Sequence, residues 1–386
     1  MNLRDTPEEA AFRAELRAWI EAELPEELRG HRGGADRFEE LGRAWSRQLA
    51  DAGYAGLTWP KEYGGADAPY THAAIYLEEL ARAGAPQHIG VIGLGMAGPT
   101  IIAHGTDEQK RRHLEKILTA EEIWCQGFSE PDAGSDLAAL RTSAVLDASG
   151  EHFVVNGQKV WSSFAHIADW CLLVTRTDPD LPKHQGLTYM LVDMHAPGVE
   201  VRPLRQITGE AEFNEIFFTD VRVPRANVLG EVGQGWGVAM TTLLHERGTL
   251  GFALTAALEV AVRKLTALVR ERAPDDPIVR DRLAREWIGL QAVKYTNLRA
   301  LTKLMQTGIP GPEGSAAKLY WSEANQRLTK QALELLGPEA QLMNGDSGGY
   351  WQYQQLRSRG NTIEAGTSEV LRNIIAERVL GLPRSR

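Results

Sequence analysis

Cysteine is scarce in this sequence, because its 386 residues contain only two, Cys125 and Cys171. Two cysteines are too few for the disulfide framework of a small secreted domain. Neither belongs to a CxxC pair or has a histidine at the spacing of metal ligands, so we expect no metal site. This cysteine content fits a reducing, cytoplasmic environment best.

Long apolar runs are also missing. No stretch of about 18 consecutive apolar residues occurs, which is the length that a membrane-spanning helix needs. The N-terminus, MNLRDTPEEAAF, has no apolar signal core. We therefore expect neither a membrane span nor secretion.

Basic residues are outnumbered, since 42 Lys and Arg stand against 51 Asp and Glu and give a net charge of −9. This balance argues against nucleic-acid binding over a broad basic face. It does not exclude a phosphorylated ligand, because a helix N-terminus or a few local cations can bind phosphate in an acidic protein.

The chain is long enough for two to three domains at the usual ~150 residues each. Helical periodicity dominates to about residue 120 and begins at a capping box formed by Thr6 and Glu9. From about residue 122, β-branched and aromatic runs predict strands, with a hairpin turn expected at Asn156-Gly157 in EHFVVNGQKVW. Helical periodicity returns after LGEVGQGW and continues to the end of the chain.

This pattern predicts an α+β fold of three domains. We expect an N-terminal helical domain at residues 1–121, a middle antiparallel β domain at 122–231 and a C-terminal helical domain at 232–386. The order of helices, sheet and helices is uncommon and is therefore informative about the fold.

Several local motifs carry little weight. The segment GLGMAG (93–98) matches the dinucleotide-binding GxGxxG string, but it lies in a helical region, precedes Pro99 and lacks a βαβ setting, so we interpret it as a loop. The ten histidines include no HExxH motif. Ser135 and Ser368 are not in a GxSxG elbow, which disfavours a hydrolase.

Three separated segments combine small residues, hydroxyls and aromatics: FSEPDAGSD (128–136), KVWSS (159–163) and IEAGTSEV (363–370). Taken singly, they are typical of a turn, a strand with a buried tryptophan and a helix cap. Together and in this order, the chain resembles the acyl-CoA dehydrogenase family of flavoproteins. The resemblance covers essentially the whole chain and includes LTWPKEYGG, AHGTDEQK, VVNGQKVW, FNEIFFTDVRVP and GTSEVLRNIIAERVLGLP.

The resemblance implies an acyl-CoA dehydrogenase-like fold in which the C-terminal domain is a four-helix bundle. It implies FAD as cofactor and an acyl-CoA thioester as substrate, which is oxidised at its α and β carbons to the trans-2-enoyl-CoA. An electron-transferring flavoprotein is the implied electron acceptor, and a homotetramer or homodimer is the implied assembly. Neither nucleic acid nor a membrane is an expected partner.

The resemblance also implies a set of cofactor contacts. Phe128 and Ser129 match positions that contact the flavin ring, and Trp161 matches the aromatic residue on the flavin face. Ser163 matches a hydroxyl that reaches flavin N5. The full set of implied cofactor-binding residues is Phe128, Ser129, Gly134, Ser135, Trp161, Ser163, Thr367 and Glu369.

The catalytic base is the second implied feature. Family members place a glutamate either just before the GT of the C-terminal loop, which is Ala365 here, or in a core helix just before an arginine, which is Glu246 before Arg247. Alanine cannot act as a base, so Glu246 is the expected base, with Glu364 as the rival one residue before Ala365. Ser135, Arg247 and Ala365 are the implied substrate-binding residues, Ala365 through its backbone N–H.

Two segments depart from the family pattern. The regions that in many members reach the FAD of a neighbouring subunit read RERAPDDPIVR (270–280) and ELLGPEA (334–340), with Glu334 and Pro338 in place of Gln and Gly. Two alternatives therefore stay open. One is a dehydrogenase or oxidase acting on an acyl group held by a carrier protein, and the other is a non-catalytic subunit of a heteromeric acyl-CoA dehydrogenase. The acyl group itself is not predicted.

Overall fold

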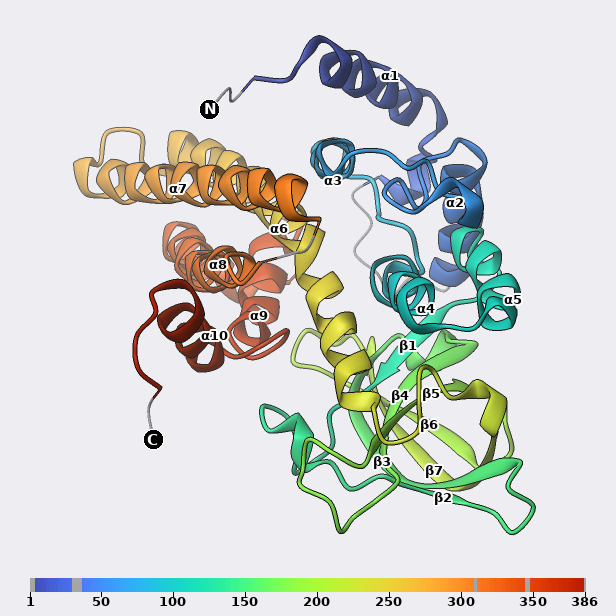
Figure 1. Ribbon diagram of the computed structural model, residues 1–386. Coiled ribbons are helices and arrows are strands. Elements are labelled where there is room, and N and C mark those ends of the chain that lie inside the picture. The colour runs from blue at the N-terminus through green and yellow to red at the C-terminus, as the bar shows by residue number, and fades with distance from the viewer. Residues whose placement is uncertain (1–3, 30–36, 309–310, 344–347, 385–386) are drawn as a thin grey trace. The chain divides into compact units, whose positions relative to one another are not determined.

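The computed structural model describes residues 4–29, 37–308, 311–343 and 348–384 (Figure 1). For residues 246–250 it describes the backbone alone. By its internal contacts the chain divides into two compact units. The sheet unit comprises Leu24–Pro69 and Pro86–Glu246, and the helical unit comprises Met1–Glu23, Tyr70–Ala85 and Arg247–Arg386.

The described part of the sheet unit contains a sheet of seven strands, drawn in green and yellow-green in Figure 1. They run in the order β1-β4-β2-β3-β7-β6, with β5 paired to β4. Pairing is antiparallel between β2 and β3, β3 and β7, β4 and β5, and β6 and β7. The strands are β1 (Trp124–Gly127), β2 (Ser143–Leu146), β3 (His152–Ser163), β4 (Trp170–Arg176), β5 (Leu187–Asp193), β6 (Val199–Leu204) and β7 (Phe213–Pro224).

The sheet is mainly antiparallel, as expected, but two of its pairings are parallel. Strand β1 pairs with β4 in parallel, and a single residue pair joins β2 to β4 in parallel. The reason is topological, because β1 enters the sheet directly from the preceding helices and a long connection separates it from β4, so the pair is not a hairpin.

Helices and single helical turns complete the sheet unit. The apolar faces of α4 and α5 contribute Ile101, Leu114 and Ile117 to one core cluster with Trp59 and Trp124. The elements are α2 (Phe38–Asp51), α4 (Gly98–His104), α5 (Asp107–Leu118), the start of α6 (Gly235–Arg272), and the short turns η1 (Glu26–Leu28), η2 (Lys61–Tyr63), η3 (Gly93–Ala97), η4 (Leu137–Ala139), η5 (Ala165–Ile167) and η6 (Arg225–Asn227).

Two local predictions are corrected here. Asn156-Gly157 does not form a hairpin: β3 continues through it, and the register against β7 shifts between Val155 and Gly157. Gly157 has φ +153°, and a Cβ there would lie 2.6 Å from Thr142 Oγ1, so the glycine serves a bulge and a close approach.

The segment 93–98 is not a loop but a π-helical turn, η3, that leads into α4. Its glycines allow close packing, because a Cβ on Gly98 would lie 2.0 Å from Cζ2 of Trp59 and one on Gly93 would lie 3.0 Å from Ile117. Gly93 and Gly98, two of the glycines that argued for a loop, are therefore packing positions.

The helical unit is built around long amphipathic helices. Its main core joins Leu258 and Leu265 of α6 to Leu290, Leu328 and Trp351. The helices are α1 (Pro7–Glu23), α3 (Tyr70–Ala83), the remainder of α6, α7 (Pro277–Thr307), α8 (Gly314–Leu336), α9 (Tyr350–Asn361) and α10 (Ser368–Ile374), with the turns η7 (Gly337–Gln341) and η8 (Ile375–Val379). No described helix is long and apolar enough to cross a membrane.

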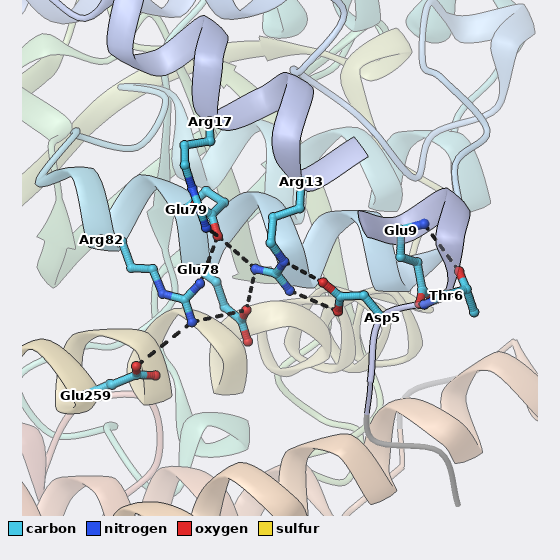
Figure 2. Close-up of polar contacts among 9 residues, drawn as sticks. All are labelled: Asp5, Thr6, Glu9, Arg13, Arg17, Glu78, Glu79, Arg82 and Glu259. Carbon is cyan, nitrogen blue, oxygen red and sulfur yellow. Dashed lines mark hydrogen bonds and ion pairs between the residues drawn. The ribbon is translucent and has the colours of Figure 1, made fainter. Parts of the chain in front are cut away.

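An ion-pair cluster ties α1 and α3 together within the helical unit (Figure 2). The buried carboxylate of Glu79 in α3 accepts hydrogen bonds from Arg13 at 2.8 Å, Arg17 at 2.8 Å and Arg82 at 2.9 Å. At the edge of the cluster, Arg82 also lies 3.9 Å from Glu259 of α6. These contacts explain why the first helix belongs with the C-terminal helices in the helical unit.

Candidate functional site

The loop that follows β1 carries four of the predicted cofactor contacts. Phe128 is buried and packs edge-on against Tyr189 at 5.9 Å between ring centroids, whereas Gly134 and Ser135 are exposed. Among the described residues, the N–H groups of Ser129, Gly134 and Ser135 donate to no acceptor. Unpaired backbone donors in a glycine-containing turn are suited to bind a phosphate.

A buried ion pair lies directly behind this loop. Lys159 of β3 is fully buried and donates to Glu130 Oε1 at 2.8 Å and to the Phe128 carbonyl at 3.1 Å. Glu130 also accepts from the N–H groups of Arg141 and Thr142 at 2.7 and 2.8 Å. Burial raises the pKa of Glu130, but the attraction of Lys159 and these hydrogen bonds outweigh it, and its pKa is lowered overall.

Strand β3 then presents Trp161 to solvent. A register shift against β7 between Lys159 and Ser162 coincides with φ +63° at Trp161, whose residue surface is 61% exposed. A left-handed tryptophan on a strand is strained, and such strain is concentrated at functional sites. Ser163, two residues on, is half-buried.

Two buried polar atoms beside Trp161 have no hydrogen-bond partner among the described residues, namely Ser162 Oγ and Asn214 Oδ1. Ser162 and Asn214 face each other across β3 and β7, and Asn214 Nδ2 donates to the Ser162 carbonyl at 3.0 Å. Buried polar groups are normally paired, so these atoms mark a polar spot next to an exposed aromatic ring.

The first turns of α6 are fixed by a chain of hydroxyl groups. Thr242 Oγ1 lies 3.0 Å from Tyr189 Oη and 3.0 Å from Thr100 Oγ1, and it donates to the Val238 carbonyl at 3.1 Å. Thr242 is fully buried. It lies four residues, or one helical turn, before Glu246, so this chain holds the helix in place close to that residue.

The predicted base and its neighbour lie in α6 as expected, but the side chains of Glu246 and Arg247 are outside the described residues. The side chain just before them is informative. Burial, and secondarily His104, lower the pKa of His245, so the ring of His245 is partly shielded from solvent, whereas Leu244 beside it is 40% exposed.

The C-terminal loop of the helical unit contains the other predicted residues. Ala365 has φ +49° and Gly366 has φ +94°. The N–H groups of Ala365, Gly366 and Thr367 donate to no acceptor among the described residues. Consecutive N–H groups in a left-handed turn form a concave donor surface that binds negatively charged oxygen.

Buried Lys318 of α8 supports this loop. Its amine donates to the Asn361 carbonyl at 2.7 Å and to the Gly366 carbonyl at 2.8 Å, and so holds both ends of the loop. Ser322 of the same helix also donates to the Asn361 carbonyl, at 2.8 Å.

Glu364 is engaged elsewhere. Its carboxylate forms a two-point ion pair with Arg357 and accepts from Asn361 Nδ2 at 2.8 Å. Thr367 caps α10 by accepting from the Val370 N–H at 3.2 Å, and Glu369 is exposed in the first turn of that helix.

The structure thus brings Phe128, Ser129 and Trp161 together through β3, and groups Ala365 with Thr367 in the other unit.

Sequence reasoning missed Lys159 and Lys318. A signal exists for both, because alternation along β3 places Lys159 on the buried face of Phe153 and Val155. Lys318 belongs to a buried polar stripe at helical spacing, which comprises Ser315, Lys318, Ser322, Asn325 and Thr329.

Comparison with known proteins decides the family. The chain matches the N-terminal domain of acyl-CoA dehydrogenase over residues 6–121, the middle domain over 125–221 and the C-terminal domain over 233–380. It is 44% identical over 383 residues to acyl-CoA dehydrogenase IpdE1 of Mycobacterium tuberculosis, with 97% of each chain covered. The chain belongs to the acyl-CoA dehydrogenase family.

Solved structures agree with this assignment. The chain is similar to a structure described as the Tcur3481-Tcur3483 steroid ACAD, with a TM-score of 0.89, 33% identity and full coverage of both chains. It is also similar to a chain of the ChsE4-ChsE5 complex from Mycobacterium tuberculosis, with a TM-score of 0.87, 33% identity and full coverage of both chains. These similarities confirm the predicted acyl-CoA dehydrogenase fold.

The protein is therefore an enzyme of the acyl-CoA dehydrogenase family, whose members are FAD-dependent flavoproteins. The described residues fit this cofactor. Unpaired N–H groups at Ser129, Gly134 and Ser135 suit its pyrophosphate and ring carbonyls, and the exposed Trp161 suits a flat ring system.

Proposed function

We propose that the chain catalyses FAD-dependent α,β-dehydrogenation of an acyl-CoA thioester to the trans-2-enoyl-CoA, with Glu246 as the base. The observation that carries this proposal is the loop at Ala365 to Thr367, which offers three consecutive unpaired N–H groups in a left-handed turn. Such donors suit the oxygen of a thioester that gains negative charge as its α proton leaves.

The proton step needs a carboxylate that is free to accept. Glu364 is held by Arg357 and Asn361, so neither of its oxygens is available without breaking these contacts. Glu246 lies one helical turn after Thr242, whose buried hydroxyl group anchors α6, and a carboxylate at this position would accept the α proton. FAD, when bound, accepts the β hydrogen as hydride.

The other proposed site residues bind the substrate and the cofactor. The Ala365 N–H stabilises the enolate-like oxygen, and Arg247 with Ser135 contributes to substrate binding. Phe128, Ser129, Trp161, Ser163, Gly134, Thr367 and Glu369 hold the cofactor. Because the α proton of a thioester is only weakly acidic, donors that are already in place lower the barrier without reorganisation.

We propose a bulky, steroid-derived acyl group as the substrate class. The support is the 33% identity, over the full chain, to a protein described as a steroid ACAD.

The test is the colour of the purified protein and its response to substrates. We expect a yellow protein whose flavin is bleached anaerobically by steroid side-chain acyl-CoA thioesters faster than by butyryl-CoA or palmitoyl-CoA. A folded, colourless protein that cannot be reconstituted with FAD would refute the proposal. Supplying the same acyl group on CoA and on a carrier protein separates the carrier-bound alternative, and hydrogen peroxide release in air separates an oxidase from an enzyme that passes electrons to an electron-transferring flavoprotein.

The second proposal concerns the oligomeric state of the protein. We propose an oligomer formed through the helical unit, in which α6 and α7 line a surface groove of about 580 Å³ with Trp287 and Ile288 exposed beside Arg263, Arg270 and Arg280. The similarity to a chain of the ChsE4-ChsE5 complex favours a heteromer over the homotetramer or homodimer.

Sedimentation distinguishes the two assemblies. A homotetramer or homodimer with a full complement of FAD supports self-association, whereas a chain that binds FAD fully only after co-expression with a second dehydrogenase chain supports the heteromer. A monomer that carries FAD at micromolar concentration would contradict both.

A further inference from the structure

Two consecutive residues of β3 hold two consecutive carbonyl groups of the cofactor loop. Lys159 Nζ donates to the Phe128 carbonyl at 3.1 Å, and the Val160 N–H donates to the Ser129 carbonyl at 2.9 Å. The loop is also closed on itself, because Glu130 and Ala133 exchange backbone hydrogen bonds at 3.1 and 3.0 Å. Its backbone is therefore fixed on the side that faces β3.

The consequence concerns the Ser129 N–H. The Phe128–Ser129 peptide bond is trans, like the other peptide bonds of the described residues, so its carbonyl and its N–H point in opposite directions. With the carbonyl held by Lys159, the N–H points away from the Lys159 amine, and it has no acceptor among the described residues. An unpaired donor in this orientation is suited to a ligand.

We propose that Lys159 is a positioning residue for the flavin: its buried amine holds the Phe128 carbonyl and so directs the Ser129 N–H at the cofactor. The inference rests on the proposed function, because that function places Phe128 and Ser129 at the flavin ring. Nothing in the resemblance to the family assigns a role to Lys159.

The side chain of Lys159 does not contact solvent. Its side chain is 0% exposed, and the Glu130 side chain is 9% exposed. Burial lowers the pKa of Lys159, and the attraction of Glu130 opposes that effect. Removing one partner of a buried pair leaves the other charge uncompensated, so the Lys159 variant also removes the charge of Glu130, and Glu130→Gln alone measures the effect of losing the ion pair.

The variants separate the ion pair from the carbonyl contact. Glu130→Gln removes the ion pair, keeps one acceptor oxygen for the Thr142 N–H, loses the acceptor of the Arg141 N–H and leaves the Lys159 contact with Phe128 in place. Lys159→Met with Glu130→Gln removes the carbonyl contact as well. The matched control is Lys183→Met with Asp136→Asn, which removes an exposed pair of 2.9 Å at the far end of the same loop.

The measurements are the dissociation constant of FAD, the visible spectrum of the bound flavin and its midpoint potential, each on the full chain with folding checked by circular dichroism. We expect Glu130→Gln and the control to match wild type within about twofold in FAD affinity. We expect Lys159→Met with Glu130→Gln to bind FAD about tenfold more weakly, which corresponds to one lost hydrogen bond, with a shifted flavin band and potential. Lys159→Leu with Glu130→Gln repeats the test if the methionine variant does not fold.

The outcomes are distinct from those of the proposed function. If wild type binds FAD and oxidises acyl-CoA, but the double variant keeps the wild-type spectrum and potential and loses only thermal stability, Lys159 is structural and the inference is overturned alone. An effect that Glu130→Gln reproduces in full also overturns it, because the ion pair would then carry the effect. If the wild-type protein does not bind FAD, the proposed function is refuted, and this inference is refuted with it.

Discussion

The carboxylate of Glu364 meets the guanidinium of Arg357 at two points, with Oε2 2.9 Å from Nη2 and Oε1 3.2 Å from Nη1. Two parallel hydrogen bonds of this kind are strong and directional. The glutamate nearest in sequence to the family's loop position is thus paired with α9, which supports the proposal that Glu246 is the base.

Replacement of these two glutamates gives the first prediction. Glu246→Gln keeps the size of the side chain and removes its basicity, so we expect flavin reduction by acyl-CoA to slow by several orders of magnitude while FAD and acyl-CoA still bind. Glu364→Gln is expected to change that rate far less. Anaerobic rapid-mixing absorbance measures both rates, and a reversed order of the two effects would move the base to Glu364.

The second prediction concerns Lys318. Lys318→Met removes the donors that hold the Asn361 and Gly366 carbonyls, so the Ala365 N–H loses its fixed direction. We expect flavin reduction to slow by about tenfold or more, because a loss of about 1.4 kcal/mol in transition-state stabilisation slows a reaction tenfold. Lys330→Met is the control on the same helix, because its side chain is 71% exposed. A Lys318→Met protein with a lower melting temperature but an unchanged rate would reduce Lys318 to a packing role.

The third prediction is a pH dependence of stability that comes from His88. Its Nδ1 accepts from the Gly90 N–H at 3.0 Å, and its Nε2 lies 3.0 Å from the Leu118 carbonyl, an arrangement that suits the neutral ring. Burial lowers the pKa of His88 from 6.5 to about 4. Between these values the unfolded chain binds a proton that the folded chain does not, so the free energy of unfolding falls as the pH falls through this window, by about 2 kcal/mol from pH 7 to pH 5.

Urea denaturation at both pH values measures this effect. His88→Asn should be less stable than wild type at pH 7 and should lose less stability on acidification. His195→Asn, at a side chain that is 74% exposed, is the control and should keep the wild-type slope. Equal slopes for wild type and His88→Asn would show that another group carries the pH dependence.

The fourth prediction concerns the cluster in Figure 2. Burial raises the pKa of Glu79, but hydrogen bonds from Arg17 and Arg13 outweigh it and the pKa is lowered overall. Glu79→Gln leaves three arginines without their shared carboxylate, and we expect a loss of about 3 kcal/mol in the free energy of unfolding near pH 7. Because a lowered carboxyl pKa adds stability only above its unfolded value, the difference from wild type should shrink below about pH 4. Glu108→Gln, at an exposed pair with Arg111, should leave the melting temperature unchanged.

Local signals in the sequence predicted those elements whose chemistry is local. Thr6 and Glu9 form the expected capping box, with bonds of 2.8 and 3.2 Å. Asn156-Gly157 misled because a glycine with positive φ serves a bulge as well as a hairpin, and only the partner strand β7 decides between them. Likewise, Gly93 and Gly98 are required by their contacts with Ile117 and Trp59, which depend on the tertiary fold.

The candidate site divides in the same way. The resemblance to the family identified the residues on the loops. It did not identify the two lysines, because each bonds a carbonyl group that is distant in sequence: Lys159 bonds Phe128, 31 residues away, and Lys318 bonds Gly366, 48 residues away. No spacing rule connects partners that far apart, and the period of β3 or α8 reveals only that a lysine occupies a buried face. The family of the chain and its cofactor were nevertheless predicted, and both are confirmed.

The unpaired N–H groups of Ser129 and Ala365 also determine which substitutions this protein can tolerate. Every residue except proline carries a backbone N–H, so many side chains at 129 and 365 should preserve the donor. The lysines behind the two loops have no such freedom, because no shorter or uncharged side chain brings an amine to the same carbonyl. A library that varies the two loops while keeping Lys159 and Lys318 should therefore retain more folded, flavin-containing variants than one that does the reverse.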